Sequence, residues 1–215
     1  MSAPGRPAAD DDDAPTPAPA VWTVGHGCLL PEALLRILRG AGIGAVVDLR
    51  TGASSRLAPW FDGPALRAML AAERIGYLAL GEQLGDRPEH AFAYDPDGHV
   101  AFERLAAAPA TVAGIGRLER VVGLGRRVAL LCHEEDPARC HRLHLVGRLI
   151  EARGATLRHL RSDGRDQDEQ DLVRGIRALP EPVRARYEAA WFLRRSFDAV
   201  RPGDPGWRDR SSPGG

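Results

Sequence analysis

The apolar residues of the chain follow two alternating patterns. Short β-rich apolar runs, each about the length of a strand, occur at residues 21–26, 43–50, 77–80, 127–132 and 156–160. Segments in which apolar residues recur at helical spacing lie between them, at residues 31–42, 64–76, 99–125 and 140–154. Strands that alternate with helices are typical of a parallel sheet covered by helices on both faces. The pattern therefore predicts a three-layer α/β domain with a mostly parallel sheet of about five strands.

Two more helical segments follow the last predicted strand, at residues 166–179 and 182–200. We therefore divide the folded part of the chain into an α/β domain, residues 21–162, and a C-terminal helical extension, residues 163–200.

The two ends of the chain differ in composition from the rest. Residues 1–20 are rich in Pro, Ala and Asp, residues 201–215 are rich in Gly, Pro and charged residues, and neither segment has apolar periodicity. Such segments cannot bury enough apolar surface to offset the entropy of ordering. We expect a disordered N-terminal tail and a flexible C-terminal tail.

The charged residues are balanced, and every basic residue is an arginine. The chain has 29 basic and 29 acidic residues and contains no lysine. Because the net charge is zero, nucleic-acid binding would need a local basic patch. The absence of lysine excludes Schiff-base chemistry and the lysine-containing phosphate loop. Arginine instead offers a permanent, planar cation that suits carboxylate or phosphate.

Cysteine usage and the length of the apolar runs indicate a cytoplasmic protein. Three cysteines, Cys28, Cys132 and Cys140, are not the disulfide framework of a small secreted domain. The N-terminus lacks the basic start and apolar run of a secretory signal, and no stretch approaches the roughly 18 apolar residues of a membrane span. We expect no membrane partner and no stable disulfide between Cys132 and Cys140.

Polar or reactive residues come at the ends of three predicted strands: Gly25, His26, Asp48, Arg50 and Cys132. Ligands of open parallel sheets bind beyond the carboxyl ends of the strands, so we expect these residues at one edge. The loop after the second strand is longer than a minimal connection and adds Ser55 and Arg56. Long loops at that edge tend to carry function.

The segment CHEEDPARCHR, residues 132–142, concentrates reactive side chains at the start of a predicted helix. Cys140 lies beside His141 and Arg142, where the helix N-terminus and the neighbouring cations favour a thiolate. The spacing between Cys132 and Cys140 does not match a structural zinc knuckle, although the fold could still gather these cysteines and His141 around a metal. The competing interpretation is that both cysteines are core residues.

The first turn of that helix also favours an anion, because backbone N–H groups and the Arg142 guanidinium lie together there. Glu134, just before the turn, could orient Arg142 or act as a base. We expect Arg142 to hold a bound anion. The alternative is that Arg142 is a buried partner of Glu134 or Asp48 and stabilises the fold.

Four short motifs occur in order along the chain: TVGHG at residues 23–27, VVDLR followed by SSR.AP.F at 46–61, LGDRP at 84–88, and C.E.....CHR at 132–142. Through these motifs, residues 22–160 resemble the family of domain of unknown function 488 (DUF488), which includes the YeaO-like proteins. The familial pattern usually has Ser after the His of the first motif, where this chain has Gly27. The resemblance implies an α/β fold and a shared polar site, without a settled reaction.

We assign the candidate residues to one convergent anion-binding cleft. The expected catalytic residues are His26, Asp48, Glu134 and His141. The expected ligand-binding residues are Gly25, Arg50, Ser55, Arg56 and Arg142. No metal is assigned, but a metal, if present, would be held by Cys132, Cys140 and His141. The cofactor is left open.

Three functions are compatible with this site. The first is an enzyme acting on a phosphorylated small molecule or nucleotide-type ligand, which the mixed acidic and basic character of the cleft favours. The second is a thiol- or metal-dependent enzyme that uses Cys132 and Cys140. The third is a non-enzymatic module that binds nucleic acid or protein, which the neutral net charge disfavours. The sequence fixes neither the substrate nor the oligomeric state.

Overall fold

The computed structural model of the chain describes residues 18–52, 58–96 and 100–192. Most of the predicted N-terminal tail, residues 1–17, and all of the predicted C-terminal tail, residues 201–215, lie outside these ranges. Residues 193–200 of the predicted helical extension also lie outside them, and the division into a domain and an extension stays a prediction.

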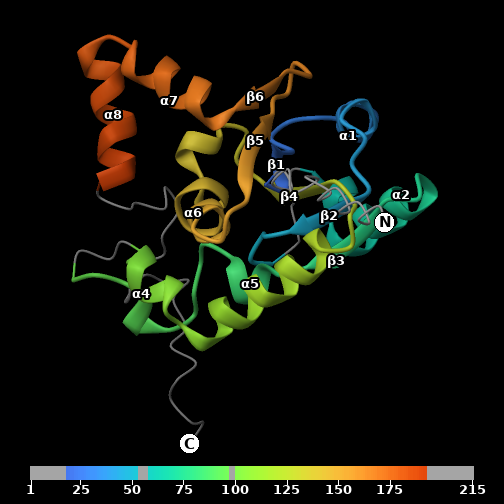
Figure 1. The fold of residues 1–215 in the computed structure, drawn as a ribbon, viewed down its shortest axis with the longest axis horizontal. Coiled ribbons are helices and arrows are strands. Elements are labelled where there is room, and N and C mark those ends of the chain that lie inside the picture. The colour runs from blue at the N-terminus through green and yellow to red at the C-terminus, as the bar shows by residue number, and fades with distance from the viewer. Residues whose placement is uncertain (1–17, 53–57, 97–99, 193–215) are drawn as a thin grey trace, which may run out of the picture.

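The centre of the fold is one six-stranded sheet (Figure 1). Its strands, in chain order, are β1 (Ala20–Gly25), β2 (Ala45–Asp48), β3 (Gly76–Ala79), β4 (Val128–Cys132), β5 (Thr156–Leu160) and β6 (Asp166–Asp168). They lie side by side in the order β3-β2-β4-β1-β5-β6. The first five in that order pair in parallel, and only β6 is antiparallel to its neighbour. The predicted α/β class and the mostly parallel sheet are confirmed.

The sixth strand corrects the prediction of a helix over residues 166–179. β6 turns back onto β5 through a tight connection in which Gly164 has a φ of +87°, a value that favours glycine. Asp166 accepts a hydrogen bond from Arg158 Nε at 2.8 Å and one from Trp22 Nε1 at 3.2 Å. The first contact joins residues eight positions apart and the second joins residues 144 positions apart. The helix begins only after Asp168, whose side chain caps it.

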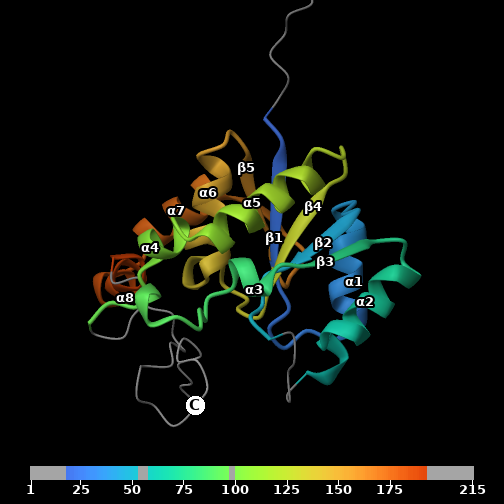
Figure 2. The same ribbon diagram turned by 90° about the horizontal axis from the view of Figure 1, so that it is seen from below.

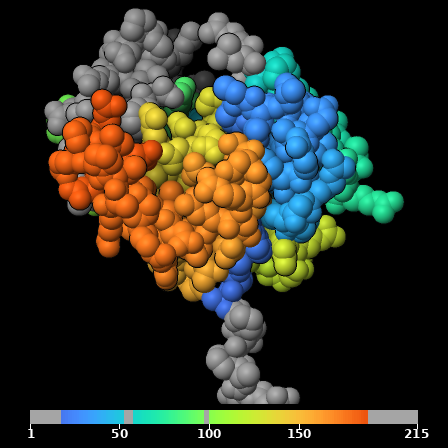
Figure 3. Space-filling model, turned by 90° about the horizontal axis from the view of Figure 1, so that it is seen from above, coloured from blue at the N-terminus to red at the C-terminus, as the bar shows by residue number. Residues whose placement is uncertain are grey.

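The helices of the described residues, in chain order, are α1 (Pro31–Gly40), α2 (Gly63–Ala72), α3 (Gly81–Leu84), α4 (Phe102–Ala106), α5 (Pro109–Val122), α6 (Arg148–Glu151), α7 (Glu169–Arg177) and α8 (Glu181–Phe192). α1 and α2 cover one face of the sheet, and α4 to α7 cover the other (Figure 2). α7 and α8, in orange, form part of the outer surface beside the segment that carries α6 (Figure 3). The two layers of helices and the sheet between them form the three layers of the domain.

Each helical layer has its own apolar core. Leu34 and Leu38 from α1 pack with Val24 and Val46 on one face of the sheet. On the other face, residues of α5 and of the segment after β4 pack against Leu130. Side chains alternate between the faces along each strand, so these two cores also fix which way the polar residues at the strand ends point.

The predicted helix over residues 140–154 is divided in two. Its first part, η4 (Arg142–Gly147), is a π-helical turn, and α6 follows directly. Gly147 lies against β5, where an added Cβ would come within 2.7 Å of a Leu157 methyl group. Wide π-turns often occur at functional sites.

No helix within the described ranges combines the length and the apolar character needed to cross a bilayer.

Candidate functional site

Three strand ends meet at one edge of the sheet. β2, β4 and β1 are consecutive in the sheet, so their last residues, Asp48, Cys132 and Gly25, lie close to one another. The pairing continues past the strands, since the N–H of His26 donates to the Cys132 carbonyl at 3.0 Å.

The side chains at this edge point to opposite faces of the sheet. Val24 and Val46 belong to the core under α1 and α2, which places His26 and Asp48, two residues further on, on that face. Leu130 belongs to the other core, which places Cys132 on the opposite face. The residues that the sequence assigned to one cleft therefore form two groups.

The first group, which we call the Arg50 network, consists of Asp48, Arg50, His26 and Tyr77. Arg50 donates to both carboxylate oxygens of Asp48, from Nε at 2.8 Å and from Nη2 at 2.7 Å. The Tyr77 hydroxyl donates to Asp48 Oδ2 at 2.9 Å, and Arg50 Nη2 also donates to the Phe61 carbonyl at 2.8 Å. Asp48 and Arg50 are both buried. A buried bidentate pair of this kind satisfies both charges inside the protein.

His26 completes the Arg50 network as a neutral acceptor. Its Nε2 lies 3.3 Å from Arg50 Nη1, and its Nδ1 lies 3.1 Å from the Gly27 carbonyl. Because a guanidinium can only donate, we place the proton of His26 on Nδ1. Burial, assisted by the charge of Arg50, lowers the pKa of His26 to about 4. Near neutral pH its lone pair is thus directed at Arg50.

The second group, which we call the thiol cluster, consists of Cys132, Cys140 and His141, with Asp86 beside them. His141 Nδ1 lies 3.8 Å from Cys132 Sγ, 3.7 Å from Cys140 Sγ and 3.6 Å from Asp86 Oδ2. The two sulfurs and the ring nitrogen all lie within 4.8 Å of one another. The cysteines are free thiols and are buried with His141, whereas the Asp86 side chain is 29% exposed.

The loop between the two cysteines returns the chain to the sheet edge. After β4 ends at Cys132, the Asp136 carboxylate accepts a hydrogen bond from the Ala138 N–H at 3.1 Å. Pro137 begins a single 3₁₀ turn, η3 (Pro137–Arg139), directly before Cys140. This compact turn explains how two cysteines eight positions apart in sequence come together.

The groups of the thiol cluster shift one another's ionisation. The hydrogen bond with Cys140, together with burial, raises the pKa of Cys132 well above its ordinary value. Burial opposes ionisation of Cys140, but the hydrogen bond with Cys132 and the charge of Arg142 outweigh it, so the pKa of Cys140 is lowered. Burial also opposes a charge on His141, yet Asp86 and Cys132 raise the pKa of His141 to about 9. The two thiols are thus shifted in opposite directions, with the pKa of Cys132 raised and that of Cys140 lowered.

The spacing of the thiol cluster matches the coordination shell of a small metal ion. Zinc lies about 2.3 Å from sulfur and about 2.0–2.1 Å from nitrogen in tetrahedral sites, so neighbouring ligand atoms are roughly 3.5–3.8 Å apart. His141 Nδ1 lies 3.7–3.8 Å from the two sulfurs. Two thiols and an imidazole are ligands that zinc prefers. Both nitrogen–sulfur distances are therefore close to those of a zinc shell, and the two sulfurs lie within 4.8 Å of each other.

A pocket of about 670 Å³ lies next to the thiol cluster, at the carboxyl ends of β2 and β3. Its walls include Thr51 after β2, Gly85, Arg87 and the first turn of α5. Asp86 stands between two of these wall residues in sequence, and its carboxylate reaches His141. The 85–87 segment thus belongs to both the pocket and the cluster.

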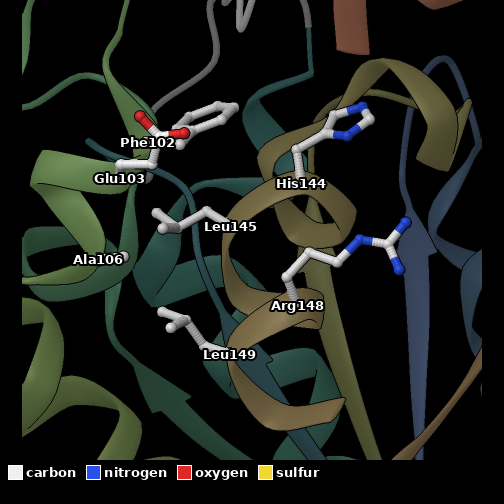
Figure 4. A pocket seen from close by; sticks show the side chains of 7 residues that line it. All are labelled: Phe102, Glu103, Ala106, His144, Leu145, Arg148 and Leu149. Carbon is white, nitrogen blue, oxygen red and sulfur yellow. The ribbon is translucent and has the colours of Figure 1, made fainter. Parts of the chain in front are cut away.

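A smaller hollow of about 320 Å³ lies between α4 and the η4–α6 segment (Figure 4). Leu145 and Leu149 point toward α4, whereas Arg148 points away from it (Figure 4). Arg148 is paired with Glu151 at 3.0 Å and with Glu169 at 2.6 Å. None of the residues that the sequence assigned to the site lines this hollow.

A family model described as "Domain of unknown function DUF488" matches residues 31–149. The match covers more than half of the 215 residues and contains the whole thiol cluster. The chain belongs to the DUF488 family. The recognition of the family from four motifs is confirmed, although TVGHG precedes the matched range. No curated protein and no solved structure matches the chain.

The arginine of the last DUF488 motif, Arg142, is buried and joins the loop after β4 to β1 by hydrogen bonds. Arg142, 1% exposed, donates from Nη1 to the Glu134 carbonyl, from Nη2 to the Glu135 carbonyl at 2.6 Å and from Nε to Thr23 Oγ1 at 3.3 Å. All three nitrogens therefore have acceptors in the protein. This arrangement favours the second expectation, that Arg142 stabilises the fold, although its partners are backbone carbonyls instead of a carboxylate.

Gly25 and Glu134 also have positions that differ from the expected roles. A Cβ at Gly25 would overlap the Glu134 carbonyl, so a glycine is needed where the loop after β4 crosses the end of β1. The Glu134 carboxylate accepts a hydrogen bond from the Asp136 N–H at 3.3 Å. Both residues shape the loop that Arg142 holds. Two other expected ligand-binding residues, Ser55 and Arg56, lie outside the described residues.

Two residues of the site were not among the candidates from the sequence. Asp86 lies in the DUF488 motif LGDRP, but its segment follows no predicted strand end directly, so only the motif could have indicated it. Tyr77 begins a predicted strand, at a position where an aromatic residue is ordinarily taken as core.

Proposed function

We propose that the protein is a metal-dependent enzyme that holds Zn²⁺ with Cys132, Cys140 and His141. One observation carries the proposal. Two buried sulfurs and a buried ring nitrogen lie within 4.8 Å of one another, and the two nitrogen–sulfur distances, 3.8 and 3.7 Å, are close to those of a tetrahedral zinc shell. Of the three functions considered from the sequence, this is the second, a thiol- or metal-dependent enzyme, with a metal ion bound by the thiols.

The same residues do not form a nucleophilic triad of Cys, His and Asp. In such a triad the thiol and the carboxylate contact different nitrogens of the imidazole. Here both sulfurs and the Asp86 carboxylate approach the same atom, Nδ1, and in the part of the chain that the structure describes Nε2 has no hydrogen-bond partner. Each cysteine is also only 4% exposed, which leaves little room for a substrate to be attacked by sulfur. Convergence on one atom supports coordination instead.

The fourth position of the centre supports a catalytic role. Structural zinc sites close the shell with a fourth Cys or His, whereas catalytic sites keep a position open. The Asp86 carboxylate approaches His141 Nδ1 at 3.6 Å and is partly exposed, and Gly85 and Arg87 on either side of it line the 670 Å³ pocket. A zinc ion held in this way would supply Lewis acidity and would lower the pKa of a bound water. We assign the reaction class as metal-assisted hydrolysis of a small molecule, with Asp86 as an exchangeable ligand or base.

The arginines that the sequence assigned to an anion, and a role in binding nucleic acid, have less support from the geometry. Arg50 and Arg142 were expected to hold an anion, but the guanidinium nitrogens of both already donate to protein acceptors. The net charge of zero gives no general attraction to nucleic acid.

Metal analysis of the purified protein tests this proposal. We expect close to one zinc per chain by elemental mass spectrometry, without added metal. Cys132→Ser and Cys140→Ser should each lose the zinc. Cys28→Ser is the matched control, since Cys28 is exposed and lies outside the cluster, and it should keep the zinc. A wild-type protein that neither carries zinc nor is stabilised against heat by added Zn²⁺ would refute the proposal.

A further inference from the structure

The 670 Å³ pocket has a rigid floor that is built from glycines. Added Cβ atoms at Gly81 and Gly85 would overlap the Arg50 carbonyl and the Thr51 hydroxyl, respectively. The α3 segment therefore packs directly against the Arg50 carbonyl and the Thr51 side chain, in the chain that leaves β2. Pockets that bind small molecules are usually formed before the ligand arrives, and this volume is in their usual range.

One wall of the pocket offers an aromatic surface. Phe92 is 50% exposed although it lines the pocket, and its ring is stacked with that of His90 at a centroid distance of 5.9 Å and an angle of 28°. Stacking a planar ring on an exposed phenyl ring is favourable, because it removes apolar surface from water and pairs two aromatic rings. The wall is therefore suited to a flat heterocycle.

The charged groups of the pocket are mixed. Arg87 lines it together with Ala110 and Thr111 of the first turn of α5, a 14-residue helix with no side-chain cap at its N-terminus. These groups attract an anion. Glu82 and Glu89 line the same pocket and would repel a polyanion. The balance fits a ligand with one anionic group and with N–H or O–H donors for the carboxylates.

We infer that this pocket binds the substrate of the neighbouring metal centre, and that the substrate has the chemistry of a nucleoside monophosphate: a planar ring, hydroxyl donors and one phosphate. The inference rests on the proposed function for the reaction, but binding itself needs only the pocket. Asp86 joins the two, because its neighbours Gly85 and Arg87 line the pocket and its carboxylate lies 3.6 Å from His141 Nδ1.

Calorimetric titration of the full chain with four probes tests the inference: adenosine 5′-monophosphate, uridine 5′-monophosphate, adenosine and ribose 5-phosphate. We expect at least one monophosphate to bind more tightly than both adenosine and ribose 5-phosphate. Phe92→Ala should weaken that binding roughly tenfold or more, as expected for loss of a base-stacking ring. Arg87→Ala should reduce the preference for the monophosphate over adenosine.

Leu124→Ala is the control, because Leu124 is 72% exposed just beyond the other end of α5 and should leave binding unchanged. Absence of binding by both monophosphates, or equal binding by wild type and Phe92→Ala, would overturn the inference. Testing Cys140→Ser separates the two proposals. If Cys140→Ser loses zinc and still binds the monophosphate, the pocket assignment stands independently of the metal. If the wild type binds a monophosphate but carries no zinc and is not stabilised by added Zn²⁺, the pocket assignment stands and the metal proposal fails. Zinc with no monophosphate binding overturns the pocket assignment alone.

Discussion

The Arg50 network and the thiol cluster lie at the same edge of the same sheet, on opposite faces. They differ in how completely their polar atoms are hydrogen-bonded. In the Arg50 network every donor meets an acceptor: Asp48 accepts from Arg50 and Tyr77, and His26 accepts from Arg50. In the thiol cluster two sulfurs and a carboxylate oxygen lie around His141 Nδ1, while Nε2 has no partner among the described residues. A closed network is suited to stability, and an incomplete one is suited to a ligand.

The two histidines show the same contrast. Burial beside Arg50 lowers the pKa of His26 to about 4. Burial would do the same to His141, but Asp86 and Cys132 raise the pKa of His141 to about 9. Residues of the same type that follow neighbouring strands can therefore have opposite roles. Perturbed ionisation alone does not identify the functional group, since structural ion pairs also cause it.

The largest effect on stability should come from breaking the Arg50 network. Arg50→Ala leaves the buried Asp48 carboxylate without its cation, and we expect the free energy of unfolding to fall by about 3–5 kcal/mol. Chemical denaturation measures this loss. The zinc content of the folded fraction should not change. If Arg50→Ala folds normally but loses zinc, the division into a structural and a functional group is wrong.

Arg142 should also contribute more to stability than to binding. Arg142→Met removes three donors and leaves buried carbonyl groups of Glu134 and Glu135 unpaired, which should cost about 3 kcal/mol in denaturant unfolding. Arg174→Ala, which changes a side chain that is 74% exposed, is the control and should stay within about 0.5 kcal/mol of wild type. An Arg142→Met chain with wild-type stability and impaired ligand binding would restore the anion-holding role.

A smaller and more specific effect is expected at Asp86. Asp86→Asn keeps the size of the side chain but removes its charge, so zinc affinity should fall by roughly 10–100-fold, as is usual for groups that support a metal site from its edge. Competition with a chromophoric chelator measures the affinity. Complete loss of zinc would indicate a closed four-ligand structural site, and unchanged affinity would remove Asp86 from the centre.

The smallest effect concerns the pH dependence of stability. His26 has a pKa of about 4 in the folded chain and an ordinary value of 6.5, so the unfolded chain takes up its proton first as the pH falls. The stability that neutral His26 provides is complete above about pH 6.5 and is lost as the pH falls toward about 4, at up to roughly 1.4 kcal/mol per pH unit.

His26→Gln places an amide near the position of Nε2 and cannot titrate, so it should flatten this part of the curve. Denaturant unfolding of both chains at about pH 7, 6 and 5 gives the two slopes. Parallel slopes would mean that His26 is not held neutral by Arg50.

The fold followed closely from the sequence, because the two apolar periods record which side of each element is buried. The prediction missed β6, a strand of three residues that pairs with β5 and whose Asp166 accepts hydrogen bonds from Arg158 in β5 and from the distant Trp22. The short length of β6 gave no periodic signal of its own.

The site was determined only in part by the sequence. The positions of His26, Asp48 and Cys132 at strand ends brought them to one edge, as parallel topology requires. The tertiary structure decided the rest: alternation along the strands put Cys132 and Asp48 on opposite faces, and a separate segment brought Asp86 to His141. It also buried Arg142 against the loop after β4, whose close approach to β1 requires the glycine at position 25. A sequence shows which chemical groups are present, but distances between segments that are far apart along the chain arise only when the layers pack.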